Sequence, residues 1–113
     1  MKLSDLNPEF IRYTGERTFY VGDPPNVQFA EADGIMFLCP TCFEKNGGPS
    51  GTHRVICNRP RVPQSEYRAG PGRWEFDGTG FDDLTLVAGS SSIALQGGCG
   101  AHFFVRGGEI IQA

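Results

Sequence analysis

Two short pairs of metal-binding residue types, far apart in the chain, place the strongest constraint on how it can fold. Cys39 and Cys42 form a Cys-x-x-Cys pair, and Cys99 and His102 form a Cys-x-x-His pair. Two ligands three positions apart can reach one ion from a tight turn, and two such turns supply the tetrahedral sulfur and nitrogen set that zinc prefers. Residues 43–98 lie between the pairs. We therefore predict one Cys3His site for Zn²⁺ that ties the middle of the chain to its end.

Two other residues compete for places around the ion. Cys57 follows the first pair at a spacing compatible with a zinc-ribbon ligand. We favour the two paired turns, because two ligands from one turn are more easily organised, and expect Cys57 to be a core thiol. His53 is expected to be a hydrogen-bonding partner of a ligand, a replacement ligand or a core histidine. The residues alone leave open whether His53 or Cys57 replaces one of the four.

The composition predicts a mainly β fold. The chain of 113 residues contains 16 glycines, 8 prolines and 12% aromatic residues, which suits short strands and many turns and disfavours helices. We predict a single small domain over residues 1–113, with about eight to ten short antiparallel strands in a sandwich or partly open barrel, stapled by one zinc ion. Few or no helices are expected.

The expected strands are alternating or β-branched and aromatic runs bounded by glycine or proline turns. They cover residues 9–13, 18–21, 27–30, 34–38, 52–57, 73–76, 84–87, 92–95, 102–106 and 109–112. Gly107 and Gly108 form the loop of a terminal hairpin, where they supply the positive φ that a two-residue loop requires. Residues 43–51 and 58–72 are predicted to be loops, because glycine and proline dominate the first and no period runs through the second.

Charge and hydropathy exclude several classes of function. The formal net charge is −3 and the pI is about 5.3, which argues against a nonspecific nucleic-acid binder. No apolar run approaches the length of a membrane span. The first residues lack the profile of a signal peptide, so we expect a soluble cytoplasmic protein. In a reducing compartment a Cys-x-x-Cys pair indicates a metal or redox site rather than a disulfide.

The sequence favours a role without catalysis. Four protein ligands leave no coordination position for water, so the zinc is expected to be structural. Asp77, Asp82 and Asp83 surround a Gly-Thr-Gly segment and are explained more simply by a turn capped by its own side chains than by acid–base chemistry. The alternative is a metal-dependent hydrolase in which water replaces one ligand and His53 or Asp82 acts as the base.

Several motifs in this order resemble a family of small uncharacterised bacterial and bacteriophage proteins, known as a domain of unknown function. They are Cys-Pro-x-Cys-Phe at 39–43, Gly-Gly-Pro-x-Gly-Thr-His at 47–53, Gly-Pro-Gly-Arg-Trp at 70–74, Gly-Thr-Gly-Phe-Asp-Asp-Leu-Thr-Leu at 78–86 and Gly-Cys-Gly-x-His-Phe-x-Val-x-x-Gly at 98–108. The resemblance implies a zinc site at Cys39, Cys42, Cys99 and His102, with His53 also matching. It implies a phage or prophage setting, in a host cell cytoplasm, and no particular activity.

These observations together predict a small phage or prophage-type zinc protein that binds another protein without catalysis. The expected contact surfaces are the 58–72 loop and the edges of the sheet. An exposed edge at 109–112 could also pair with a second copy to form a homodimer. Besides the hydrolase, the alternative is a nucleic-acid-associated phage protein that uses the arginine-rich segment 54–73.

Overall fold

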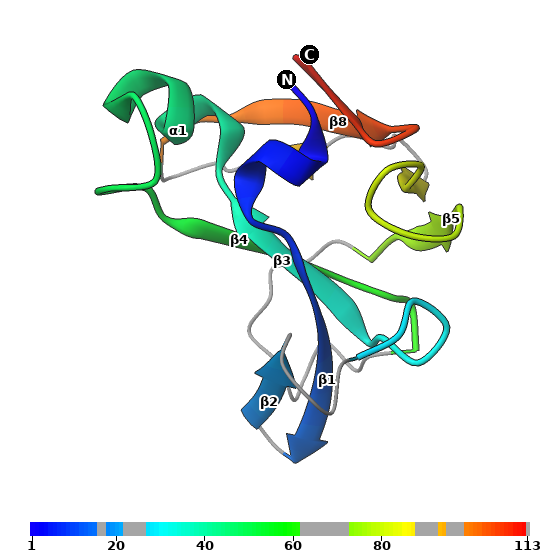
Figure 1. Cartoon of the computed structure of the whole chain (residues 1–113). Helices are drawn as coiled ribbons and strands as arrows, with labels where there is room; N and C mark the ends of the chain where they lie inside the picture. The colour runs from blue at the N-terminus through cyan, green and yellow to red at the C-terminus, as the bar shows by residue number, and fades with distance from the viewer. Residues whose placement is uncertain (16–17, 22–26, 62–72, 88–92, 95–98, 113) are drawn as a thin grey trace.

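The mainly β fold expected from the composition is confirmed. The computed structural model describes residues 1–15, 18–21, 27–61, 73–87, 93–94 and 99–112 (Figure 1). Within these ranges, nine strands, one α-helix and one 3₁₀ helix are present, and the strands form three small antiparallel sheets. In the same part of the chain, no helix is both long and apolar enough to cross a membrane.

The largest sheet has four strands in the order β2-β1-β3-β4. These strands are β1 (Glu9–Gly15), β2 (Thr18–Val21), β3 (Gly34–Leu38) and β4 (Arg54–Asn58). Each neighbouring pair is antiparallel. The apolar run expected as a buried strand is β3, whose residues are all buried except the partly exposed Met36. It occupies the centre of the sheet between β1 and β4.

The strand expected at residues 27–30 is absent, and a turn occupies this position. The carbonyl oxygen of Gln28 accepts hydrogen bonds from the backbone N–H groups of Glu31 at 3.0 Å and Ala32 at 2.9 Å. These bonds close the backbone on itself, so it cannot form a ladder. The expected strand 18–21 instead pairs back with β1, where Tyr13 lies opposite Phe19.

The second half of the chain forms the two smaller sheets. β5 (Glu75–Asp77) pairs with β6 (Thr85–Val87), and β7 (Ile93–Ala94), β8 (His102–Arg106) and β9 (Glu109–Gln112) form the third sheet. The terminal hairpin of β8 and β9 has the predicted bounds, and Gly107 and Gly108 in its loop have φ of 54° and 76°. Of the predicted 58–72 loop, residues 62–72 lie outside the described part of the chain.

A short helix, α1 (Pro40–Asn46), includes the first residues of the segment 43–51, which was predicted to be a loop. Pro40 occupies the first helical turn, where its fixed φ favours a helix and its missing N–H is not needed. Gly47 ends the helix with a φ of 71°, and its N–H donates to the carbonyl oxygen of Glu44 at 3.3 Å. The expectation of a loop was wrong here because these terminal signals outweigh the glycine-rich composition that follows.

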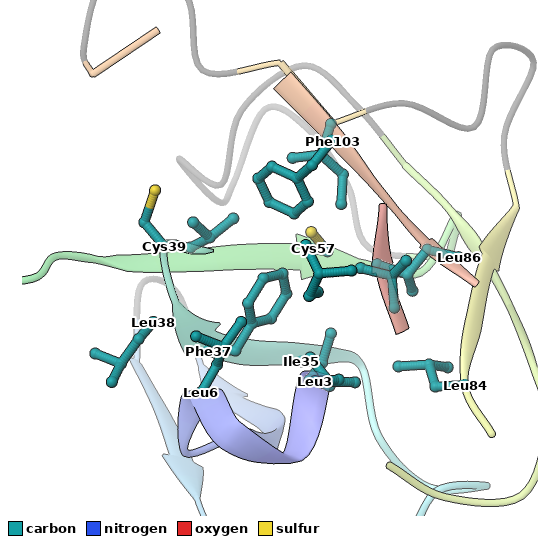
Figure 2. Packing of buried hydrophobic residues seen from close by; sticks show 14 of the residues in the cluster. Leu3, Leu6, Ile35, Phe37, Leu38, Cys39, Cys57, Leu84, Leu86 and Phe103 are labelled. Atoms are coloured by element: carbon teal, nitrogen blue, oxygen red, sulfur yellow. The ribbon is translucent and has the colours of Figure 1, made fainter. Parts of the chain in front are cut away.

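One apolar cluster joins all three sheets (Figure 2). The ring of Phe37 in β3 lies edge-on to that of Phe103 in β8, with 6.1 Å between the centroids and 77° between the planes. Leu84 contributes to it from the loop between β5 and β6, and Leu86 contributes from β6. The 3₁₀ helix η1 (Leu3–Leu6) adds two buried leucines. The core therefore holds β3 directly against the C-terminal hairpin.

The edge of β9 that was expected to be exposed is paired with the N-terminus. The backbone N–H of Ile110 donates to the carbonyl oxygen of Met1 at 2.9 Å, and that of Leu3 donates to the carbonyl oxygen of Gly108 at 2.8 Å. Figure 1 shows the two ends of the chain beside each other. Residues 1–3 thus occupy this edge from Gly108 to Ile110.

Replacing either hairpin glycine with alanine tests the packing of the terminal hairpin. At Gly107 a Cβ would meet nothing within 4 Å, whereas at Gly108 it would overlap the carbonyl oxygen of Asp82. We expect Gly107→Ala to lower the free energy of unfolding by about 1 kcal/mol, because a residue with a Cβ is strained in the left-handed region. We expect Gly108→Ala to lower it by about 3 kcal/mol or more, because the overlap adds to that strain. Urea denaturation measures both. Equal losses would contradict the close contact with residue 82.

Candidate metal centre

Four side chains from three separate segments converge at one end of the central sheet. They are Cys39, Cys42, His53 and Cys99, and their ligand atoms all lie within 4.8 Å of one another. The Sγ atoms of Cys39 and Cys99 are 3.6 Å apart, and the Nε2 atom of His53 is 3.4 Å from the Sγ atom of Cys99. The structure thus brings together three of the four predicted ligands with a histidine other than the one predicted.

The register of β3 and β4 brings Cys39 and His53 together. Directly opposite residues of an antiparallel pair point to the same face, and the buried pair Phe37 and Val55 lies opposite in this ladder. Cys39 and His53 lie two residues beyond this pair, one on each strand. The N–H of Cys39 donates to the carbonyl oxygen of His53 at 2.9 Å. Cys39 and His53 therefore continue the core-facing rows of the two strands beyond the last ladder pair.

The helix α1 supplies the second thiol. Cys39 is the residue that caps the helix, with an extended backbone, and Cys42 follows three positions later in the first helical turn. A capping residue and the third helical residue lie on the same side of a helix start. This local geometry therefore places both sulfurs on one side of the turn.

The third thiol comes from far along the chain, immediately before β8. Gly100 adopts a φ of 74° and turns the backbone directly after Cys99. Ala101, the next residue, is buried, so the chain enters the core at this point. Figure 1 shows α1 beside the beginning of β8, which is the proximity that this cluster requires.

Two separations between ligand atoms are close to the edges of a zinc tetrahedron. With zinc–sulfur bonds of about 2.3 Å and zinc–nitrogen bonds of about 2.0 Å, ideal tetrahedral angles separate two sulfurs by about 3.8 Å and a sulfur and a nitrogen by about 3.5 Å. The corresponding separations here are 3.6 Å and 3.4 Å. The same sulfurs are too far apart for a disulfide, whose bond is about 2.05 Å long, and all four cysteines of the chain are free.

His102, the fourth ligand predicted from the sequence, lies outside this group. It is exposed in β8, opposite Ala94, and its ring centroid is 6.4 Å from that of Phe104. Because Phe103 and Val105 point into the core, the alternation of the strand turns His102 to the opposite face. The Cys-x-x-His spacing does not produce a turn here, because the strand has already begun at the histidine.

Cys57 occupies the core position that was expected for it. Its side chain is 0% exposed, and Figure 2 shows it among the labelled apolar side chains, whereas Cys39 lies at the edge of the cluster with its sulfur pointing away. Burial raises the pKa of Cys57 far above the usual value of a thiol. Cys57 is therefore a core thiol, and it is not a member of the metal-ligand group.

The pKa values of Cys39 and Cys99 differ because the two thiols have different surroundings. Burial raises the pKa of Cys39 to about 12, against the opposing effect of a hydrogen bond from the Cys42 backbone. Burial also raises the pKa of Cys99, but hydrogen bonds from the His53 side chain, the Ala101 backbone and the neighbouring thiols outweigh it and lower this pKa to about 7. Without metal, Cys99 thus ionises more readily than Cys39.

The acidic segment near residue 80 is a capped turn, as the sequence suggested. The Asp83 carboxylate accepts hydrogen bonds from the backbone N–H groups of Thr79 at 2.8 Å and Gly80 at 2.9 Å, and from the Thr79 hydroxyl at 2.8 Å. These bonds hold the pKa of Asp83 below its usual value. The metal-ligand group contains no carboxylate, so Asp82, the proposed base of a hydrolase, is not among its members.

Thiol modification tests the different environments of the cysteines. In protein freed of metal with a chelator, at a temperature at which circular dichroism shows that it is still folded, we expect iodoacetamide to modify Cys99 first and Cys57 last, because Cys99 is exposed and Cys57 is fully buried. The rate at Cys99 should rise with pH around its pKa of about 7, since the thiolate is the nucleophile. Peptide mass spectrometry over time measures the order. Equal rates at both thiols would contradict the arrangement.

Comparisons with known proteins leave the chain without an assigned family, since no protein-family model, curated protein or solved structure matches it. The function of the chain therefore has to be inferred from the geometry of the metal-ligand group and from the chemistry of its side chains.

Proposed function

We propose that this protein is a small non-enzymatic domain whose fold depends on one zinc ion, and that it acts by binding another protein. The observation that carries the metal part is the convergence of Cys39, Cys42, His53 and Cys99 within 4.8 Å. A Cys3His set is a common ligand set of structural zinc, and its four atoms complete the coordination of the ion. His53 takes the place that the sequence assigned to His102.

The ion would connect two paired strands of the largest sheet to a strand of the third sheet. Cys39 ends β3 and caps α1, His53 precedes β4, and Cys99 leads into β8. β3 and β4 are already paired in one ladder, whereas β8 meets β3 through the apolar core. A small chain gains stability from such a staple, because structural zinc in small domains contributes about 10 kcal/mol or more of folding free energy.

A hydrolytic zinc site is less well supported. Catalytic zinc retains an open position for water and is bound by three protein ligands, whereas four protein ligands converge here. The group also includes no carboxylate that could act as a base. We therefore propose a structural rather than a catalytic ion.

A nucleic-acid-binding role also loses support, because two arginines of the segment proposed for it are engaged within the chain. An Nη atom of Arg59 donates to the carbonyl oxygen of Phe29 at 2.6 Å. Arg61 donates to the carboxylate of Asp33 at 3.0 Å and to the carbonyl oxygen of Ala32 at 2.7 Å. These bonds hold the turn before β3, which leaves fewer cations for phosphate contacts.

The proposed protein partner is supported by the outer face of the C-terminal hairpin. Ile111 is 40% exposed on this face, opposite the half-buried Phe104. The guanidinium of Arg106 lies 4.3 Å from the centroid of the Phe104 ring. An aromatic residue flanked by an aliphatic residue and an arginine has the composition of interface cores. The phage or prophage setting rests on the motif resemblance alone.

Zinc content in two histidine variants tests the ligand set. We expect one zinc per chain in the wild-type protein and in His102→Ala, and a loss of zinc to a competing chelator in His53→Ala. Elemental analysis after dialysis gives the stoichiometry, and the visible spectrum of the cobalt-substituted protein reports tetrahedral thiolate coordination. His102→Ala is a matched control, because it removes the same side chain from a site outside the cluster.

The opposite result would reassign the site. Zinc lost from His102→Ala and retained by His53→Ala would show that His102 is the ligand and that the observed cluster is not the zinc site. Wild-type protein without zinc, after expression in zinc-containing medium, would refute the structural-zinc proposal altogether.

Removal of the metal tests its contribution to stability. If zinc is present at a hundred or more times its dissociation constant, its loss costs about 3 kcal/mol or more, and the midpoint of thermal unfolding should fall by roughly 10 °C or more. We expect this fall in the midpoint when a chelator removes the zinc. We expect the Cys39→Ser protein to be unfolded or aggregated. The core variant Cys57→Ala should retain one zinc although it is less stable. A metal-free Cys39→Ser protein as stable as the wild type would contradict the proposal.

A further inference from the structure

The four side chains of the metal-ligand group differ in their access to solvent. Cys39 is fully buried and Cys42 is partly buried. Cys99 and His53 are exposed. A zinc ion bound by this group is therefore open to solvent on the side of Cys99 and His53, and covered on the side of Cys39. A reagent that arrives from solvent meets the sulfur of Cys99 first, and exposure is one of the properties that decide which thiol is oxidised.

The exposed thiol has a second thiol within reach. The Sγ atom of Cys99 is 3.6 Å from the Sγ atom of Cys39. A disulfide bond is about 2.05 Å long, so the two sulfurs need to approach each other by about 1.5 Å to form one. Cys57, by contrast, is fully buried and is not a member of the group. Oxidation of the group can therefore end in a disulfide within it.

Hydrogen peroxide oxidises such a pair of thiolates in two steps. Ligation keeps the sulfurs deprotonated, and the thiolate is the nucleophile. In the first step the sulfur of Cys99 attacks one oxygen of the peroxide, the O–O bond breaks, hydroxide leaves and a sulfenic acid forms. In the second step the sulfur of Cys39 attacks the sulfur of Cys99, the S–O bond breaks and a second hydroxide leaves. The two thiolates lose two electrons, the peroxide gains them, and each hydroxide takes a proton from solvent to become water.

We propose that the metal centre is a reversible redox switch, in which hydrogen peroxide oxidises Cys99, a disulfide forms between Cys39 and Cys99, and the zinc is released. This inference rests on the proposed function, because it requires zinc in the group. Zinc is released because Cys42 and His53 alone do not complete a tetrahedral site. The disulfide joins the same two segments as the ion, the end of β3 and the residues before β8, so the link between the two sheets survives the loss of zinc.

The test exposes the zinc-loaded full chain to millimolar hydrogen peroxide at neutral pH. A chromogenic chelator measures zinc release against a sample without peroxide, and peptide mass spectrometry after alkylation of the free thiols identifies the linked cysteines. We expect release of the one zinc and a disulfide between Cys39 and Cys99. Dithiothreitol followed by zinc should restore the zinc content. The oxidised protein should unfold at a higher temperature than reduced protein freed of zinc by a chelator, because the disulfide restricts the unfolded chain.

Two matched variants test which sulfur is attacked. Cys99→His and Cys42→His each leave two cysteines and two histidines, which is also a zinc ligand set. We expect Cys42→His to release zinc at about the wild-type rate, because it retains both sulfurs of the proposed disulfide. We expect Cys99→His to release zinc about tenfold more slowly or less, because it lacks the exposed sulfur. The core variant Cys57→Ala should behave as the wild type.

Three outcomes would overturn the proposal. They are zinc that stays bound to the wild type in millimolar peroxide, a disulfide between Cys39 and Cys42 in place of the expected one, and equal rates of release from the two histidine variants. If a histidine variant holds no zinc before the peroxide is added, the disulfide found in the wild type decides. A wild-type chain without zinc at the start refutes the zinc site and the switch together, whereas one zinc that peroxide does not release refutes only the switch.

Discussion

The antiparallel ladder between β3 and β4 is the constraint on which the rest of the structure depends. Its register sets Phe37 opposite Val55 on the core face, and the same rows continue to Cys39 and His53, whose backbones are hydrogen-bonded. A shift of the register by one residue would turn one row to the other face. It would then expose core side chains and separate the histidine from the thiols. The apolar core and the metal-ligand group therefore require the same register.

The sequence predicted the three thiols of the metal-ligand group, but it favoured His102 as the histidine and left open whether His53 replaces a ligand, for a physical reason. Cys39 and Cys42 are placed by the local geometry of one helix start, which their spacing reveals. The position of a histidine depends instead on whether the chain at that point is a turn or a strand. At His102 the strand has begun and the alternation set by Phe103 directs the histidine outward. Pairing residues 34–38 with 54–58 in register would have indicated His53, because it follows the Leu38–Arg54 pair.

Much of the strand pattern was likewise predictable, and the errors occur where terminal signals compete with composition. Continuous apolar or alternating runs identified β3 and the terminal hairpin, because core burial on one face imposes that pattern. Residues 27–30 have strand-like composition, but local hydrogen bonds around Gln28 form a turn there. Residues 40–46 precede a glycine-rich segment, yet a proline at the start and a glycine just past the end suffice for two turns of helix. Both outcomes depend on local hydrogen bonds and on the residues at the ends of the segment, which composition alone does not report.

The central strand also links the metal-ligand group to β1 in the first part of the chain. Glu9 lies opposite Met36, and Phe10 lies opposite Ile35, in the ladder between β1 and β3, while the far end of β3 leads into the first thiol. Phe10 in β1 is thus paired with the strand whose other end leads into the first thiol. An ion bound at that end would restrict fraying of β3 and so help to keep Phe10 in place. Because β3 lies between β1 and β4, such an ion would support both of the ladders that β3 forms.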